Sequence, residues 1–222
     1  MPTTFYHTPS GSAALLFRRV ACLIAARFAM KIRGVIFDMD GTVTAPYLEF
    51  GLIKTAAGLG DVDLLDYLRG ATGAEYERVQ GLLMQFEEDG VANAKLNLGA
   101  RTVLRYLRRA KIPTGLLTRN SRKSVAGVCA KLKLRFDVVL AREDAPHKPA
   151  PEPIWQMARQ WGLRREELLM VGDYKWDVMC AQNAGIPCAV LLDGETPDWA
   201  AGATHRIRRL TELIPIIEGR RR

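Results

Sequence analysis

The stretch that decides the fold spans residues 34–44 and reads GVIFDMDGTVT. Its apolar, partly β-branched first half predicts a short buried strand. Asp38 and Asp40 follow at the end of this strand. Because side chains at positions i and i+2 of an extended chain share a face, the two carboxylates point the same way. Gly41 then permits a sharp turn or a close approach of the backbone to a ligand. Two like charges at a strand end indicate a site that binds a cation, shares a proton, or both.

Two other interpretations fit this acid pair taken alone. One is a polar turn after a strand. The other is an EF-hand calcium loop, because Asp38, Asp40, Thr42 and Glu49 occupy its first, third, fifth and twelfth positions. That loop requires glycine at its sixth position, where this chain has Val43, and it follows a helix rather than a strand. The sequence therefore disfavours calcium.

Polar residues also follow two further predicted strands, at residues 112–117 and 168–171, and precede a predicted helix at residues 154–161. Because ligands bind at the carboxyl ends of the strands in open α/β sheets, we expect these residues to converge on one edge. Each residue taken alone also fits a structural role, as a helix cap, a solvated charge or a decoration of a helix start. The residues concerned are Thr118, Arg119, Asn120, Lys148, Asp173 and Asp177.

These residues form four motifs along the chain: the acid pair Asp38 and Asp40, the hydroxyl of Thr118, Lys148, and the acid pair Asp173 and Asp177. In this order they resemble the motifs of the haloacid dehalogenase-like (HAD) hydrolase superfamily, in its phosphatase branch. The resemblance covers residues 34–217 and implies an α/β fold, with a Rossmann-like parallel sheet flanked by helices. It divides the chain into an N-terminal extension (1–33), a hydrolase core (34–44 and 97–218) and a small α-helical cap insertion (45–96). Within the cap, apolar periodicity predicts helices at residues 61–69 and 74–88.

The resemblance also implies residue roles. Asp38 is expected to attack phosphorus and form an aspartyl-phosphate, while Asp40 acts as general acid and base. Thr118 and Lys148 are expected to bind the phosphoryl group, and Arg119 and Asn120 to contact substrate or to open the following helix. A magnesium ion is expected on Asp38, the main-chain carbonyl of Asp40 and Asp173, with Asp177 either adding a ligand or orienting the others through hydrogen bonds.

These roles predict a Mg²⁺-dependent phosphatase that acts on a small phosphomonoester. The presence of Asp40 disfavours a dehalogenase, because the dehalogenases of this superfamily lack the second aspartate. A phosphomutase of the same fold keeps both aspartates and stays an alternative, as does a catalytically weak module that binds phosphorylated metabolites for regulation. Intact Asp38 and Asp40 count against that module.

The charge distribution bears on partners. The net charge is +8, of which residues 1–33 contribute +5 and the C-terminal arginines 220–222 contribute +3, so the body between them is neutral. Residues 43–96 carry a net charge of −5, which would repel a polyanion that approaches over the cap. With no basic–aromatic stripe in view, the sequence predicts a small phosphorylated metabolite and no nucleic-acid partner.

Apolar runs, cysteines and the N-terminal extension indicate the cellular compartment of the protein. No uninterrupted apolar run of 18 residues predicts a membrane span. The four cysteines lack metal-ligand spacing and indicate reduced thiols in an intracellular protein. The N-terminal extension contains hydroxyl-bearing residues early, arginines later and no acid before Asp38, which predicts an organellar transit peptide for mitochondrion or plastid. The alternative is a cytoplasmic protein whose true start is Met30. The sequence indicates no oligomeric state.

Overall fold

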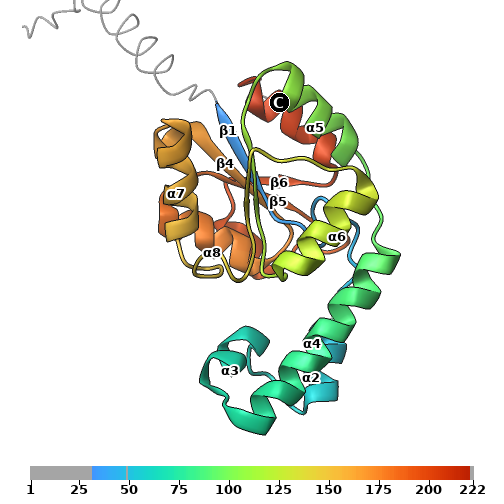
Figure 1. Ribbon diagram of the computed structural model, residues 1–222. Helices are drawn as coiled ribbons and strands as arrows, with labels where there is room; N and C mark the ends of the chain where they lie inside the picture. The colour runs from blue at the N-terminus through green and yellow to red at the C-terminus, as the bar shows by residue number, and fades with distance from the viewer. Residues whose placement is uncertain (1–31, 49, 221–222) are drawn as a thin grey trace, which may run out of the picture. The chain divides into compact units, whose positions relative to one another are not determined.

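The computed structural model describes residues 32–48 and 50–220, and within them six strands form one parallel sheet (Figure 1). The strand order is β3-β2-β1-β4-β5-β6, so the predicted first strand lies in the middle of the sheet. The strands are β1 (Gly34–Phe37), β2 (Thr114–Leu117), β3 (Val138–Leu140), β4 (Leu168–Gly172), β5 (Cys188–Leu191) and β6 (His205–Ile207). The expected Rossmann-like α/β fold is confirmed.

Helices cover both faces of this sheet. One face is covered by α5 (Ala100–Arg109), α6 (Arg122–Leu132) and α9 (Leu213–Ile217), and the other by α7 (Glu152–Trp161) and α8 (Lys175–Ala184). Along β1 the side chains alternate as a pleated strand requires. Val35 and Phe37 pack on the face covered by α5, α6 and α9, and Ile36 packs on the face covered by α7 and α8. Both faces of β1 are therefore buried, which explains its continuous apolar sequence.

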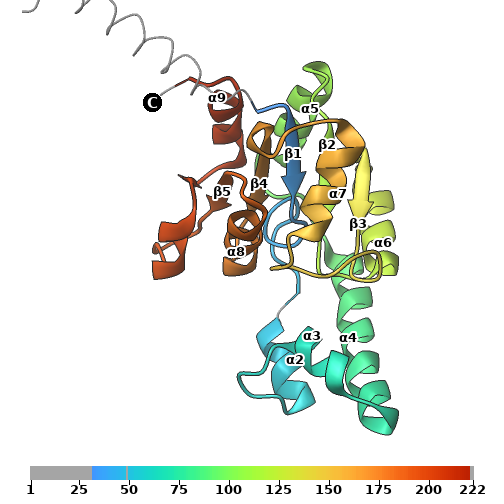
Figure 2. The ribbon, with the colours of Figure 1, turned by 90° about the vertical axis from the view of Figure 1, so that its left-hand side faces the viewer.

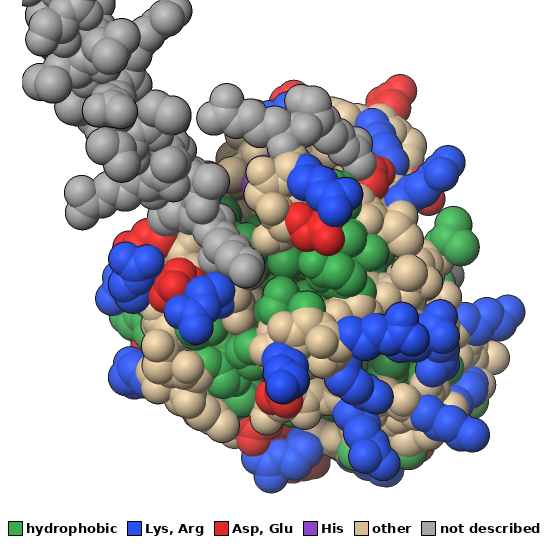
Figure 3. Space-filling model, turned by 90° about the horizontal axis from the view of Figure 1, so that it is seen from above, with side chains coloured by type: hydrophobic (Ala, Val, Ile, Leu, Met, Phe, Trp, Pro, Cys, Tyr) green, Lys and Arg blue, Asp and Glu red, His purple; other side chains and the backbone are tan. Residues whose placement is uncertain are grey.

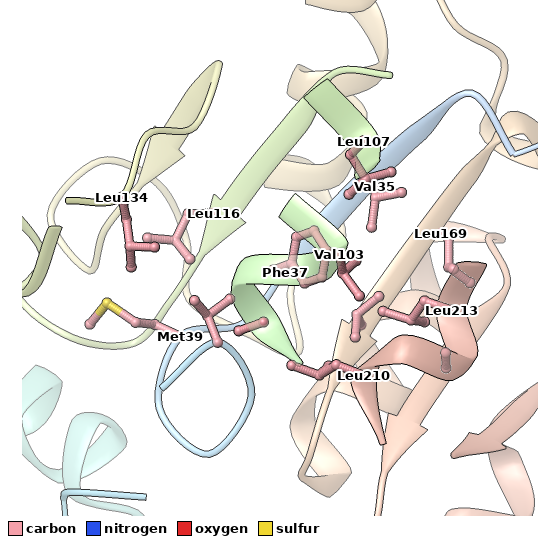
Figure 4. Packing of buried hydrophobic residues seen from close by; sticks show 14 of the residues in the cluster. Val35, Phe37, Met39, Val103, Leu107, Leu116, Leu134, Leu169, Leu210 and Leu213 are labelled. Carbon is pink, nitrogen blue, oxygen red and sulfur yellow. The ribbon is translucent and has the colours of Figure 1, made fainter. Parts of the chain in front are cut away.

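The side chains between the sheet and α5 pack around Phe37, which is buried between α5, β2 and β4 (Figure 4). The figure shows Val103 of α5 next to Phe37 and Leu107 of α5 next to Val35, with Leu210 and Leu213 in the same group of side chains. This packing fixes β1 in the sheet, and with it the position at which the acid pair leaves the strand.

Three helices are inserted between β1 and α5: α2 (Phe50–Ala57), α3 (Leu64–Gly70) and α4 (Gly73–Asn93). They have a small apolar core of their own, which includes Ile53, Leu65 and Leu83. Figures 1 and 2 place them beyond the carboxyl ends of the strands, facing the edge where ligands bind in such sheets.

Several boundaries differ from the sequence expectation. Helix α2 was not expected, and α3 begins at Leu64 rather than at residue 61, after its N-cap Asp63. Helix α4 continues to Asn93, and the absence of a side chain at Gly90 lets Tyr47 pack against its last turns. Strand β2 begins at Thr114 rather than at residue 112: Ile112 still donates to the carbonyl of Leu107 in α5, and Pro113 has no N–H to give to a ladder.

Short 3₁₀ helices complete the core at Arg165–Glu167, Asp198–Gly202 and Leu210–Glu212. Of the described residues, no helix is both long and apolar enough to cross a bilayer. Residues 1–31 of the segment for which the sequence predicts a transit peptide, Met30 among them, lie outside the described residues.

Candidate active site

The loop after β1 and the loop after β4 meet at the carboxyl edge of the sheet. The Asp38 amide donates to the carbonyl of Val171 at 2.8 Å, which extends the pairing of the two strands into the loops. Gly41 has a φ of 81°, and a Cβ there would overlap the carboxylate of Asp173. Glycine at position 41 thus serves both a left-handed turn and a close approach. The Thr42 hydroxyl donates to Asp173 Oδ1 at 2.8 Å and fixes that carboxylate beside the turn.

Lys148 lies between two carboxylates in the centre of the site. Its Nζ donates to Asp38 Oδ1 and, at 2.6 Å, to Asp177 Oδ1. All three side chains are buried or nearly so. Asp177 Oδ2 accepts from the amide of Tyr174 at 3.1 Å, in a capping arrangement that opens α8. Both oxygens of Asp177 are therefore engaged in hydrogen bonds, whereas in Asp38 and Asp173 the hydrogen bonds from Lys148 and Thr42 reach only Oδ1.

Asp40 is turned toward the segment that leads into the cap. Its carboxylate accepts from the amides of Tyr47 at 2.9 Å and Leu48 at 3.3 Å. The side chain lines a cavity of about 390 Å³ that extends from Asp38 toward α2 and α3. Asp40 thus stands beside Asp38, on the side of the site where the cap begins.

The residues after β2 occupy three different surroundings. Thr118 is buried at the end of the strand, and its hydroxyl accepts from the amide of Asn120 at 3.2 Å. Asn120 donates through its side chain to the Tyr47 hydroxyl at 2.8 Å. Arg119 forms an ion pair with Asp63, and its guanidinium lies 5.5 Å from the centre of the Trp176 ring. The segment after β2 therefore contacts the cap and its lead-in as well as the cavity.

Burial dominates the electrostatics of the acid cluster. It raises the pKa of Asp38 well above its ordinary value, against the opposing attraction of Lys148. Burial likewise raises the pKa of Asp40 to about 6 and, with help from nearby Asp177, that of Asp173 to about 7. Burial alone would lower the pKa of Lys148, but Asp177 and Asp38 outweigh it and raise that pKa. One ammonium group faces four carboxylates in a small buried volume, so the cluster carries excess negative charge.

This excess charge and the donor set fit a hard divalent cation. Oxygen atoms of Asp38, Asp173 and Asp177 lie within 4.8 Å of one another, as ligands to one ion must. Carboxylate oxygens with room for water are what Mg²⁺ prefers. Because hydrogen bonds engage both oxygens of Asp177, the donor set favours Asp38 and Asp173 as direct ligands and Asp177 as a group that orients Lys148.

Sequence reasoning predicted eight site residues, and all eight line one cavity. It did not single out Asp63, Tyr47 or Trp176, which contact the predicted residues. Asp63 carries a signal in the sequence, since an aspartate directly before an apolar helical segment is a typical N-cap, and its carboxylate does accept from the amides of Leu65 and Asp66. Its pairing with Arg119 joins residues 56 positions apart, which no local pattern predicts.

The family model for haloacid dehalogenase-like hydrolases matches residues 52–191. The chain belongs to the haloacid dehalogenase-like hydrolase family. A haloacid dehalogenase-like hydrolase domain-containing protein of Arabidopsis thaliana is 27% identical over 82% of this chain and 84% of its own length.

Among further relatives of this HAD chain, the pyrophosphatase PpaX of Bacillus cereus is 33% identical over 85% of this chain and 97% of its own length. A phosphoglycolate phosphatase of Photorhabdus laumondii is 29% identical over 77% of this chain and 85% of its own length. The crystal structure of a hydrolase from Pseudomonas syringae superposes with a TM-score of 0.68 at 20% identity, over 84% of this chain and 98% of the other, and supports the fold.

Proposed function

We propose that this chain is a Mg²⁺-dependent phosphatase that hydrolyses a small phosphomonoester through an aspartyl-phosphate on Asp38. The observation that carries the proposal is the convergence of Asp38, Lys148, Asp173 and Thr118 at one sheet edge, with Asp40 beside them on the cap side. Relatives named as a phosphoglycolate phosphatase and a pyrophosphatase support hydrolysis of a small phosphorylated substrate, the first of them of a phosphomonoester.

The first step uses Asp38 as nucleophile. Lys148 donates to its Oδ1, which fixes the carboxylate and leaves a second lone pair on Oδ1 for a cation, so Oδ2 is the oxygen that attacks the phosphorus atom of a bound substrate. Lys148 and the Thr118 hydroxyl stabilise the charge on the phosphoryl oxygens. A bound Mg²⁺, held by Asp38, the Asp40 carbonyl and Asp173, would supply further charge neutralisation and fix the phosphate against the nucleophile.

Proton transfer falls to Asp40. Its carboxylate lies between the nucleophile and the cap, where the leaving group of a phosphomonoester has to extend. Asp40 donates a proton to the leaving oxygen in the first step and takes one from the attacking water in the second. The amides of Tyr47 and Leu48 hold it in place for both steps.

The cavity also limits the substrate. A volume of about 390 Å³, lined on the cap side by Lys54 of α2 and Leu64 of α3, fits a phosphorylated metabolite rather than a polymer. The acidic net charge of the cap points the same way, since it opposes a polyanion on that side.

The test is phosphate release by the full chain from a panel of phosphomonoesters that includes phosphoglycolate, with pyrophosphate added, in the presence and absence of Mg²⁺. Asp38→Asn protein is assayed in parallel. Release by the parent that requires Mg²⁺ and disappears in Asp38→Asn supports the proposal. Intramolecular transfer of phosphate on a sugar would favour the phosphomutase alternative, and saturable binding without release would favour the regulatory module.

A further inference from the structure

The neutral net charge of the body conceals a strong separation of charge. Between residues 97 and 136 there are eleven lysines and arginines and no aspartate or glutamate. This segment comprises α5, β2, α6 and the connection to β3. Its charge is balanced in the total by acids elsewhere, above all in the cap, so a count over the whole body does not reveal it.

Three of the eleven cations belong to the region of the active site and cap: Arg119, Arg122 and Lys123 form ion pairs with Asp63, Asp144 and Glu88. Lys131 donates to the carbonyls of Val91 and Ala92 near the end of α4. The other seven are exposed, and within residues 32–48 and 50–220 none of them forms an ion pair. We call these seven the basic face: Arg101, Arg105, Arg108, Arg109, Lys111, Lys133 and Arg135.

The basic face is continuous. On α5, residues 101, 105, 108 and 109 fall within an arc of roughly 100° at 3.6 residues per turn, so they project from one side of the helix. Arg101 donates to the carbonyl of Leu132 at the end of α6, at 3.1 Å, which brings Lys133 next to the start of α5. Figure 3 looks down on the amino-end edge of the sheet and shows lysine and arginine side chains gathered on one side of it.

A hollow of about 670 Å³ opens within this face. Arg108, Lys111 and Arg135 stand around it, and Leu104, Ile112 and Phe136 provide apolar and aromatic surface. The one acid at its rim, Asp137, accepts hydrogen bonds from the amide and hydroxyl of Thr114, at 2.7 and 3.0 Å. The hollow therefore offers cations beside a partly apolar wall, as a site for a nucleotide does.

The sequence predicted no nucleic-acid partner, but the position of these cations in the fold leads to a different inference: we propose that the basic face binds single-stranded nucleic acid, with the backbone phosphates along α5 and an unpaired base in the hollow. A row of unpaired cations supplies phosphate contacts that carry no sequence preference. An unpaired strand fits better than a duplex, because only an unpaired base can enter the hollow beside Phe136. The inference is independent of the phosphatase proposal, since the hollow lies at the start of β2 and the acid cluster lines a separate cavity at the carboxyl ends of the strands.

A membrane surface is the less suitable partner. Insertion into the membrane interface, which adds to the attraction between cations and anionic lipids, needs large exposed apolar side chains beside the cations. On α5 and at residues 133–137, no large hydrophobic side chain among the described residues is exposed. The negative charges of the cap and of the catalytic cavity would repel the phosphates of a nucleic-acid strand, which restricts such a strand to the opposite edge of the molecule.

The experiment measures binding of fluorescein-labelled oligouridylate and oligothymidylate, each about twenty nucleotides long, to the full chain by fluorescence anisotropy. The test variant is Arg105→Glu/Arg108→Glu. The control is Arg159→Glu/Lys95→Glu, which reverses two exposed charges outside the basic face. Because both variants keep the arginines of the chain termini, the difference between them isolates the basic face.

We expect the parent and the control to bind both strands, with affinity that falls steeply between about 50 and 200 mM salt. The test variant should bind at least about tenfold more weakly with a shallower salt dependence, since about 0.7 in slope is lost per phosphate contact. Phosphatase turnover should be the same in all three. Equal weakening in the control, no binding by the parent, or binding to anionic phospholipid vesicles but to neither strand would overturn the proposal.

Discussion

At the scale of single residues, the geometry of the site depends on its acidic and basic side chains and on Gly41, which has no side chain. Asp38, Asp40, Lys148 and Asp173 have to lie within hydrogen-bond reach of a common point, and Gly41 allows the two acidic loops to approach. The chemistry is carried by the acids and the lysine, but their separation is set by a residue that carries no functional group.

Replacement of Gly41 by alanine tests this dependence. The new Cβ would overlap the Asp173 carboxylate, and the backbone would be held at positive φ, which alone costs about 1–2 kcal/mol. We expect turnover to fall about a hundredfold, because displacement of Asp173 disturbs the geometry of the whole site. Phosphate release and urea unfolding measure the two effects.

Gly58→Ala is the matched control. Gly58 also has positive φ, at 73°, but a Cβ there meets nothing within 4 Å. This variant should lose about 1 kcal/mol of stability and keep its turnover. Similar turnover in the two variants would show that the Gly41 approach does not position the site.

At the scale of elements, α4 connects cap and core through a buried carboxylate. Glu87 on α4 accepts from the Ser121 amide at the start of α6, at 3.0 Å, and from Arg142 at 2.7 Å. Arg142 in turn donates to the carbonyl of Arg119 at 3.2 Å. One acid of the cap helix thus fixes the segment that follows the predicted phosphate ligand Thr118.

Glu87→Ala should therefore be costly. Breaking the buried pair leaves Arg142 with only the more distant carboxylate of the exposed Glu143, at 3.9 Å, and leaves the Ser121 amide without its acceptor, at a cost of about 3 kcal/mol. The neighbouring Glu88 pairs with Lys123 at the surface, where such pairs contribute about 0–1 kcal/mol. Denaturant unfolding of Glu87→Ala and Glu88→Ala should separate the two by more than 2 kcal/mol, by the same reckoning. Equal losses would contradict the assignment of Glu87 as a buried link.

The ion pair between Asp63, the N-cap of α3, and Arg119, after β2, predicts that the stability of the protein depends on pH. Burial tends to raise the pKa of Asp63, but the hydrogen bond and charge of Arg119 outweigh it and lower that pKa. A lowered folded-state pKa stabilises the protein above the unfolded value of about 3.9, and this stabilisation is lost as the pH falls through the folded-state pKa.

Asp63→Asn keeps a good N-cap and removes the charge. Because Asp63 is only half-buried, the parent should exceed it in stability by about 1 kcal/mol or less at neutral pH. The difference should decline below about pH 5 and vanish near pH 2. Urea unfolding across this range measures it, and a difference that persists at the acid end would show that the ion pair is not its source.

At the scale of the whole molecule, the fold and the convergence of the eight predicted residues on one cavity could be predicted from the sequence because the signals are local. GVIF followed by two aspartates predicts a buried strand with acids at its end, and parallel strands bring such ends together. The links between cap and core could not be predicted, since Asp63–Arg119 and Glu87–Arg142 join positions more than fifty residues apart.

Charge is the second property that the sequence left unclear. The body sums to zero, and only the fold reveals that α5, the end of α6 and residues 133–135 share one surface while the acids gather in the cap and in the site. A net charge describes the whole molecule, whereas binding depends on where the charges lie.

The excess negative charge of the site predicts stabilisation by Mg²⁺. A cation that binds only the folded protein at about 100 times its Kd adds about 2.7 kcal/mol of stability. For a chain of this size that corresponds to a rise in Tm of roughly 5–10 °C. Asp173→Asn should abolish the Mg²⁺-dependent shift, and Asp193→Asn, at an exposed acid, should keep it. A shift that survives in Asp173→Asn would exclude the acid cluster as the metal site.

The central claim is that Asp38 becomes phosphorylated during turnover. The most direct measurement is acid quenching of the full chain during turnover of its best substrate with Mg²⁺, followed by mass mapping of the phosphoryl group. We predict one phosphorylated carboxylate, on Asp38, which appears with substrate and is absent from Asp38→Asn. Phosphate release by Asp38→Asn at the parent's rate, or a phosphoryl group on another residue, would contradict the mechanism.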